Sequence, residues 1–259
     1  MIPAGFAGVE AQLWLWMVAM IRPGAAFLAA PVFGASFVPV QLRLIIALAV
    51  GIPALAATNF QLPAEGLASI DGFMLVVGEV MAGLAIGFAV QIGFSAAMLA
   101  GETISNAMGL GFAGMVDPST GAQNPMLSQF LMIVATFLFL AIGGHLALAV
   151  TIVESYRALP PGDAWLGADS IRGLVLFGGV LFAAGLSIAL PVGFAIILVQ
   201  LVMGMLARSA PQLNLFSVGL PAALLAGIVL LAMAAPVMGD GIIAVLQQGL
   251  AEARRLALG

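Results

Sequence analysis

Charge is so scarce in this chain that water cannot be the solvent for most of its surface. Its 259 residues include 7 Arg and 11 Asp or Glu, so that 7% are charged, whereas a soluble domain is about 25% charged. Hydrophobic residues make up 63% of the chain, and so few charges cannot cover a folded body in water. The composition therefore predicts a protein that lies in a bilayer, in a larger assembly, or in both.

The same composition excludes several classes of function. A formal net charge of -4 argues against nucleic-acid binding, which needs a clustered cationic face. The chain has no cysteine and one histidine, which excludes disulfide scaffolds, iron–sulfur clusters and the usual zinc sites. Neither a Gly-x-Ser-x-Gly elbow nor a catalytic pair of carboxylates can be identified. We therefore expect no enzyme, no metal and no cofactor.

Hydropathy in windows of about 19 residues divides the chain into six apolar stretches. The third, fifth and sixth are longer than the roughly 20 residues that a straight helix needs to cross the hydrocarbon core. Pro191, Pro221 and Pro236 interrupt the last two, and each removes a helical hydrogen bond. We predict an all-α, membrane-associated bundle of about six long, kinked helices that partner helices cover in part. The stretches are about residues 12–32, 44–57, 72–100, 126–153, 173–207 and 213–246.

Two ionisable residues, Arg22 and Glu79, lie inside apolar stretches. Such charges are costly unless they are paired or set against water. An ion pathway is one reading, but two isolated charges make no relay, so we favour a pair with each other or with another subunit. Glu79, Gly83 and Gly87 follow one another at helical turns and predict a face for close helix packing. For the single histidine, His145, we favour a hydrogen-bonded structural role over a proton relay.

Residues 101–125 are unlike an ordinary external loop. Gly109-Leu-Gly-Phe-Ala-Gly114 matches the dinucleotide pattern, but no β-α-β unit surrounds it, and no acid lies between Asp117 and Glu154. Apolar side chains on a glycine-rich backbone can fill an irregular gap and leave it again. We predict a re-entrant or plugging loop, with a poorly ordered external loop as the alternative. Its plug residues are Met108, Gly109, Leu110, Gly111, Phe112, Gly114, Met115, Asp117 and Pro118.

Several short motifs follow one another along nearly the whole chain. They are Arg22 with Pro31, Pro39 and Arg43; Gly101-Glu-Thr-Ile104; Met108-Gly-Leu-Gly-Phe-Ala113 and Val116-Asp-Pro118; Gly144-His-Leu146; Leu190-Pro-Val192; and Arg208, Pro211-Gln-Leu213, Phe216, Gly219 and Pro221. Each is weak alone, but together they resemble the flagellar branch of the export-gate family shared with type III secretion systems. Ala207 departs mildly from that family, in which a polar residue often precedes the arginine.

The resemblance implies a non-enzymatic subunit of a hetero-oligomeric, helical export gate in the bacterial inner membrane, at the flagellar basal body. Its partners there would be FliP, FliQ, FlhB and FlhA. Within one membrane-associated domain, residues 1–172 would be FliP-like and residues 173–259 would form a FliQ-like hairpin. Residues 109–123 would plug the pore for unfolded flagellar proteins.

The resemblance also places the turn with Arg208, Pro211 and Gln212 on the cytoplasmic side, facing FlhB. Two other functions remain open from the residues themselves. One is a secondary transporter of small solutes, whose discontinuous helices would also contain prolines. The other is a passive assembly scaffold, in which residues 109–123 would have no gating role.

Overall fold

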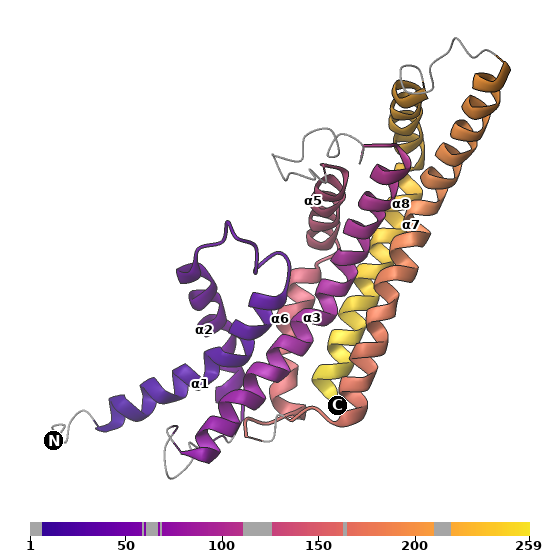
Figure 1. Ribbon diagram of the computed structural model, residues 1–259. Coiled ribbons are helices and arrows are strands. Elements are labelled where there is room, and N and C mark those ends of the chain that lie inside the picture. The colour runs from indigo at the N-terminus through magenta and orange to yellow at the C-terminus, as the bar shows by residue number, and fades with distance from the viewer. Residues whose placement is uncertain are drawn as a thin grey trace. The chain divides into compact units, whose positions relative to one another are not determined.

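The computed structural model of the protein describes residues 7–58, 60, 67, 69–110, 126–162, 165–209 and 219–259. In these ranges every regular element is a helix and no strand occurs, which confirms the predicted all-α class. Figure 1 labels the helices, which are α1 (Ala7–Ala29), α2 (Val40–Ala56), α3 (Ile70–Ala107), α5 (Met126–Ala141), α6 (Gly144–Ala158), α7 (Ala168–Ser209) and α8 (Leu220–Leu258).

The described residues contain seven helices where the sequence predicts about six, because the fourth apolar stretch is broken. It forms α5 and α6, which are separated by a break at residues 142–143. Gly143, between them, has a φ of 72°, in the left-handed region that glycine enters at little cost. The carbonyl oxygen of Gly143 accepts from the N–H groups of Leu146 and Ala147, both at 3.0 Å. A new helix can therefore start directly after the bend.

Two of the three prolines predicted to interrupt long helices lie inside them. Pro191 lies within α7 and Pro236 within α8. Pro221 is instead the second residue of α8, in its first turn. The N–H groups of the first turn have no acceptor within the helix, so a proline there removes no helical hydrogen bond. The predicted stretch begins at residue 213, and α8 as described begins at Leu220, so Pro221 lies in the first turn of a helix rather than in its interior.

Among the described residues, four helices, α1, α3, α7 and α8, are long and apolar enough to cross a membrane, and α5 with α6 would make a fifth, broken span. The chain is thus a membrane protein, as its composition predicts. In their most apolar windows, 56% of the residues of α3 are buried, against 28% for α7 and 17% for α8. Much of α3 is therefore covered within this chain, whereas α7 and α8 leave most of their apolar surface open.

The chain divides into two compact units, and each contains part of α3, α7 and α8. Unit 1 comprises Met1–Ile92, Gly143–Gly178 and Gln247–Gly259, and unit 2 comprises Gly93–Ile142 and Gly179–Leu246.

In unit 2, glycines bring other helices close to α3. A Cβ atom at Gly101 of α3 would lie 2.6 Å from the Cα of Ser128 in α5. One at Gly185 of α7 would lie 3.0 Å from the carbonyl oxygen of Ala96 in α3. Contacts of this kind, in which small residues let backbones approach, are typical of helices in membranes.

In unit 1, a proline and a tyrosine determine how α1 lies against α2 and α6. Pro23 has no N–H, so the carbonyl oxygen of Ala19, four residues earlier in α1, loses its usual helical donor. The Tyr156 hydroxyl of α6 donates to that oxygen at 3.1 Å. α2 approaches the same oxygen at Gly51, where a Cβ atom would overlap it. Three helices therefore meet at one backbone oxygen, and only glycine fits on the α2 side.

We predict that Gly51→Ala destabilises the protein by about 1–3 kcal/mol, because the added methyl group pushes α2 away from the Ala19 carbonyl. The thermal unfolding midpoint of the detergent-purified protein measures this. Gly24→Ala in α1 is the matched control, since its Cβ would meet only the Ala47 Cβ, at 3.9 Å. Alanine there should be neutral or stabilise by about 0.5–1 kcal/mol. Equal midpoints for both variants would contradict the predicted contact.

Candidate functional site

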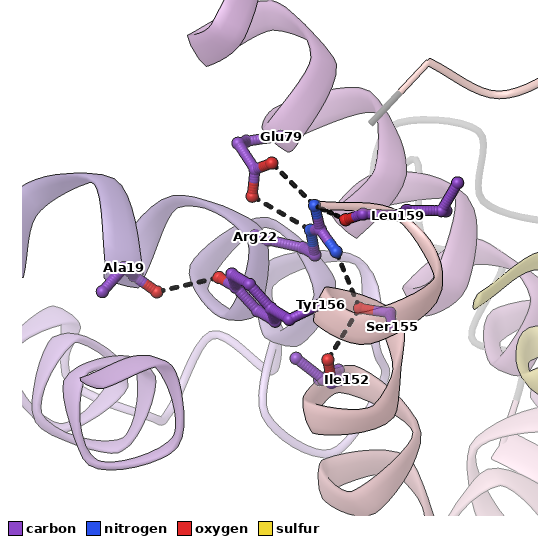
Figure 2. A network of polar contacts seen from close by, with 7 residues as sticks. All are labelled: Ala19, Arg22, Glu79, Ile152, Ser155, Tyr156 and Leu159. Carbon is purple, nitrogen blue, oxygen red and sulfur yellow. Dashed lines mark hydrogen bonds and ion pairs between the residues drawn. The ribbon is translucent and has the colours of Figure 1, made fainter. Parts of the chain in front are cut away.

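Arg22 and Glu79 form an ion pair inside unit 1, and both side chains are wholly buried. The Nε atom of Arg22 donates to Glu79 Oε2 at 3.0 Å, and Nη2 donates to Oε1 at 2.6 Å. Figure 2 shows these two bonds side by side. Bidentate pairing fixes the angle between the two planar groups as well as their distance. The pair joins α1 to α3, which is one of the two arrangements that the sequence favours over an ion pathway.

The remaining contacts of Arg22 reach the end of α6 (Figure 2). Nη1 donates to the Ser155 hydroxyl at 3.0 Å, and Nη2 also donates to the Leu159 carbonyl at 2.8 Å. The Ser155 hydroxyl in turn donates to the Ile152 carbonyl at 2.6 Å. The ring of Tyr156 lies against the guanidinium, with its centroid 4.2 Å from Cζ. Because Leu159 caps the C-terminus of α6, the cation lies where helix carbonyls attract positive charge.

This network is suited to joining helices rather than to moving protons. Each charge is balanced by the other, and a relay would need further titratable groups in a row. Within the described ranges, no group of three or more His, Cys, Asp or Glu side chains could hold a metal ion. His145 is half-buried at the start of α6, and its Nδ1 atom has no hydrogen-bond partner among the described residues. The site is thus a junction of α1, α3 and α6.

The predicted packing face of α3 lies against α1. A Cβ atom at Gly83 would overlap the carbonyl oxygen of Arg22, and one at Gly87 would overlap that of Ala26. The backbones of the two helices therefore touch along this face. The close approach brings the Arg22 guanidinium within bonding distance of Glu79, one turn before Gly83 on the same helix.

α3 continues through residues 101–107 and ends at Ala107, so the first seven residues of the predicted loop 101–125 are helical and that part of the prediction is wrong. Backbone donors serve the last carbonyl groups of α3. Gly109 has a φ of 79°, and its N–H donates to the Asn106 carbonyl at 3.0 Å. The N–H of Leu110 donates to the Ser105 carbonyl at 3.1 Å. These two bonds form a Schellman motif, in which a glycine in the left-handed region stops a helix. The first glycine of the apparent dinucleotide pattern is therefore a helix stop.

Side chains and backbone of α7 and α8 contact the same helix end. The carbonyl oxygen of Ala107 accepts from Nε2 of Gln200, in α7, at 2.7 Å. Met108 is 3% exposed and lies against Gly227 of α8, where a Cβ atom would come within 2.8 Å of three Met108 side-chain atoms. The end of α3 is therefore held from two sides within unit 2.

Other predicted site residues lie outside the described ranges. In the plug segment they are Gly111, Phe112, Gly114, Met115, Asp117 and Pro118, and in the predicted FlhB-facing turn they are Pro211 and Gln212. Arg208, from the same turn, is exposed in the last turn of α7. The roles of these residues stay predictions.

Comparison with known proteins identifies the family. The sequence model of the family described as "Bacterial export proteins, family 1" matches residues 13–249. The chain belongs to this family of bacterial export proteins. The flagellar biosynthetic protein FliR of Escherichia coli (strain K12) is 34% identical over 229 residues, which are 88% of this chain and 85% of that protein. FliR of Pectobacterium carotovorum subsp. carotovorum is 34% identical over 218 residues, or 84% and 83% of the two chains.

Sequence reasoning missed Ser155 and Tyr156 at the junction of α1, α3 and α6, and it missed Gln200 and Gly227 at the end of α3. Two of them had a signal. Tyr156 is the single tyrosine of the chain. Pro23 has no N–H, so its presence in a helix predicts a backbone carbonyl four residues earlier that needs a donor from another element. Gln200 is a polar side chain in an apolar stretch, where we would expect it to form a hydrogen bond within the protein. Gly227 is one of 32 glycines, and nothing in the sequence distinguishes it.

We predict that Arg22→Met lowers the free energy of unfolding by about 3–5 kcal/mol, because it leaves the Glu79 carboxylate buried without its counter-ion. The double variant Arg22→Met with Glu79→Met should be closer to the wild type than this single variant, since it buries no unpaired charge. Arg255→Met, which removes an exposed pair with Glu252, should cost less than about 1 kcal/mol. Thermal midpoints in detergent give the order. A double variant less stable than Arg22→Met would overturn this account of the pair.

We also predict that Gly83→Leu keeps the chain out of the larger assembly that its composition predicts, because the side chain holds α1 and α3 apart. The measurement is the amount of complex that co-purifies with a tagged chain. Gly167→Leu, just before α7, is the control, since no atom lies within 4 Å of a Cβ there and the position lies outside the apolar faces of α7 and α8. A normal yield for Gly83→Leu would show that the close contact is dispensable.

Proposed function

We propose that this chain is a non-enzymatic subunit of the flagellar type III protein export gate, in the bacterial inner membrane at the flagellar basal body. The family match over residues 13–249 carries this proposal, and the name of the FliR relatives supports the flagellar assignment. FliP, FliQ, FlhB and FlhA are its partners in the gate. Unfolded flagellar proteins are the exported chains.

The two parts of the chain have different places in the proposed gate. Residues 1–172 correspond to a FliP-like subunit, and residues 173–259 correspond to a FliQ-like hairpin. The hairpin is made of α7 and α8, and their exposed apolar surface supports its place beside further helices. The exposed Arg208 at the end of α7 belongs to the turn that faces FlhB.

The prolines inside α7 and α8 support the view that protein or water, rather than lipid alone, surrounds these two helices. Pro191 and Pro236 have no N–H, so the carbonyl oxygens of Ser187 and Ala232, four residues earlier, lose their usual helical donor. All four residues are exposed in this chain. Lipid tails offer no donors, and such interruptions are tolerated where protein or a water-lined cavity covers them. In the proposed gate, partner helices supply the protein cover and the export conduit supplies the water-lined cavity.

Residues 109–123 close the proposed pore at rest. Their apolar side chains and glycines suit a protein-lined constriction. The segment begins at the end of α3, which α7 contacts through Gln200 and α8 contacts through Gly227. These two helices therefore hold the residues from which the segment starts. A lining without strong charge also suits export, since a dense charged ring would retain cargo of opposite charge.

Deleting residues 109–123 tests the proposal. We predict an assembled complex with a raised leak of small ions, because the pore loses its closure, and leak and flagellar protein export should be measured together. Unchanged leak from a complex of normal composition would contradict the plug assignment. Solute transport by the purified chain without FliP and FliQ would instead favour a small-solute transporter.

A further inference from the structure

We propose that unit 1 binds the headgroup of a zwitterionic phospholipid, phosphatidylethanolamine, in a hollow between the ends of α2 and α6 and the start of α3. The hollow measures about 790 Å³, which lies within the range of about 300–1,000 Å³ typical of small-molecule sites. Asp71 of α3 and Arg157 of α6 both line it. It therefore presents one carboxylate and one guanidinium to a ligand, and this inference does not depend on the export function.

The two charges in the hollow pair neither with each other nor with another side chain of the described residues. The ion pairs of those residues join Arg22 to Glu79, Arg254 to Glu154 and Arg255 to Glu252. An ion of one sign in the hollow would be attracted by one of its two charges and repelled by the other. A ligand with a cation and an anion a few bonds apart is attracted by both Asp71 and Arg157.

The polar groups of the hollow match the headgroup in kind. A guanidinium such as that of Arg157 binds a phosphate through its planar set of donors. The ammonium group of ethanolamine has three N–H donors, and the Asp71 carboxylate accepts from it. Thr58 lines the same hollow. Its hydroxyl donates to the Leu55 carbonyl at 2.7 Å, which leaves the oxygen lone pairs to accept. A choline headgroup has methyl groups in place of these donors.

An apolar surface adjoins the polar groups, as a lipid requires. Phe60, Met74 and Leu75 line the hollow together with the two charges. Met74 is 46% exposed, whereas Leu75 is buried. The start of an acyl chain can therefore lie against these side chains and remove apolar surface from water. A soluble zwitterion would leave this surface uncovered.

The hollow lies at the ends of helices that could cross a membrane. Asp71 is the second residue of α3, and Arg157 is the last residue but one of α6. α3 is a candidate span, and α6 belongs to the broken one. Trp165, in the connection that follows α6, is 51% exposed, and tryptophan is enriched where a membrane meets water. Lipid headgroups occupy this level.

Each of the two charges also complements the dipole of its own helix. Asp71 lies in the first turn of α3 and Arg157 in the last turn of α6, where these signs of charge stabilise a helix. A role confined to the dipoles predicts an effect on stability and no preference among lipids. The identity of the bound lipid therefore separates the two roles.

The test measures which lipids stay bound to the full-length, detergent-purified chain. The chain is incubated with equal amounts of phosphatidylethanolamine, phosphatidylglycerol and phosphatidylcholine in mixed micelles, and the lipids that remain after washing are quantified by mass spectrometry. We expect the wild type to retain phosphatidylethanolamine about three- to fivefold over each of the other two, the change expected from one ion pair that water can reach.

The two charges should have different effects when they are removed. Asp71→Asn should abolish the preference over phosphatidylglycerol, because the ammonium loses its counter-ion while the phosphate keeps Arg157. Arg157→Gln should lower the retention of all three lipids about three- to fivefold, since each has a phosphate. Asp71→Glu and Arg157→Lys keep the charges and should retain most of the wild-type binding. Asp169→Asn and Arg172→Gln are matched controls, because these exposed charges of α7 do not line the hollow.

Three results would overturn the proposal. One is equal retention of the three lipids by the wild type, and another is a preference for phosphatidylglycerol. The third is a preference for phosphatidylethanolamine that Asp71→Asn and Arg157→Gln leave unchanged.

Free phosphoethanolamine, which has both charges and no acyl chains, distinguishes a membrane lipid from a soluble ligand. It should displace little of the bound lipid, because it leaves the apolar lining uncovered. Displacement at equal concentration would overturn the lipid assignment. Lipid retention by the purified chain does not involve export, so this proposal and the export-gate function fail independently.

Discussion

In a membrane chain with 18 charges among 259 residues, a polar group inside the fold must find its partner within the protein, because lipid offers none. Among the described residues, three such contacts join one helix to another. The Arg22 guanidinium pairs with Glu79 and reaches the end of α6. The carbonyl freed by Pro23 receives the Tyr156 hydroxyl, and the last carbonyl of α3 receives the Gln200 amide. In each case the partner comes from another helix, so satisfying a polar group also fixes how helices pack.

These polar contacts depend on close approach, which glycine provides. Gly83 and Gly87 let the backbone of α1 touch α3, and this brings Arg22 to Glu79. Gly51 lets α2 reach the backbone oxygen that already bonds Tyr156. Gly227 leaves room for Met108 beside the carbonyl that Gln200 serves. Small residues and polar partners thus act together, and a larger side chain at one of these glycines would disturb the neighbouring bond as well as the packing.

The helical class, the long apolar stretches and the two buried charges could be predicted from the sequence, because hydropathy and the cost of an intramembrane charge act locally. The break of the fourth stretch at Gly143 could not, since glycines are common in this chain and only the backbone angle marks this one as a bend. The helix stop at Gly109 was hidden inside an apparent dinucleotide pattern. Gln200 and Gly227 lie about 90 and 120 residues from the carbonyl and side chain that they contact, and no local pattern predicts such pairs.

The two polar junctions differ in strength in a way that suits different roles. Breaking a buried, bidentate pair such as Arg22–Glu79 costs about 3–5 kcal/mol, so the junction of α1, α3 and α6 is a fixed part of the fold. The single bond from Gln200 to Ala107 is exposed, and a typical hydrogen bond of this kind contributes about 0.5–1.5 kcal/mol. Since about 1.4 kcal/mol corresponds to a tenfold change in an equilibrium, that bond is strong enough to bias the α3 terminus and weak enough to be released.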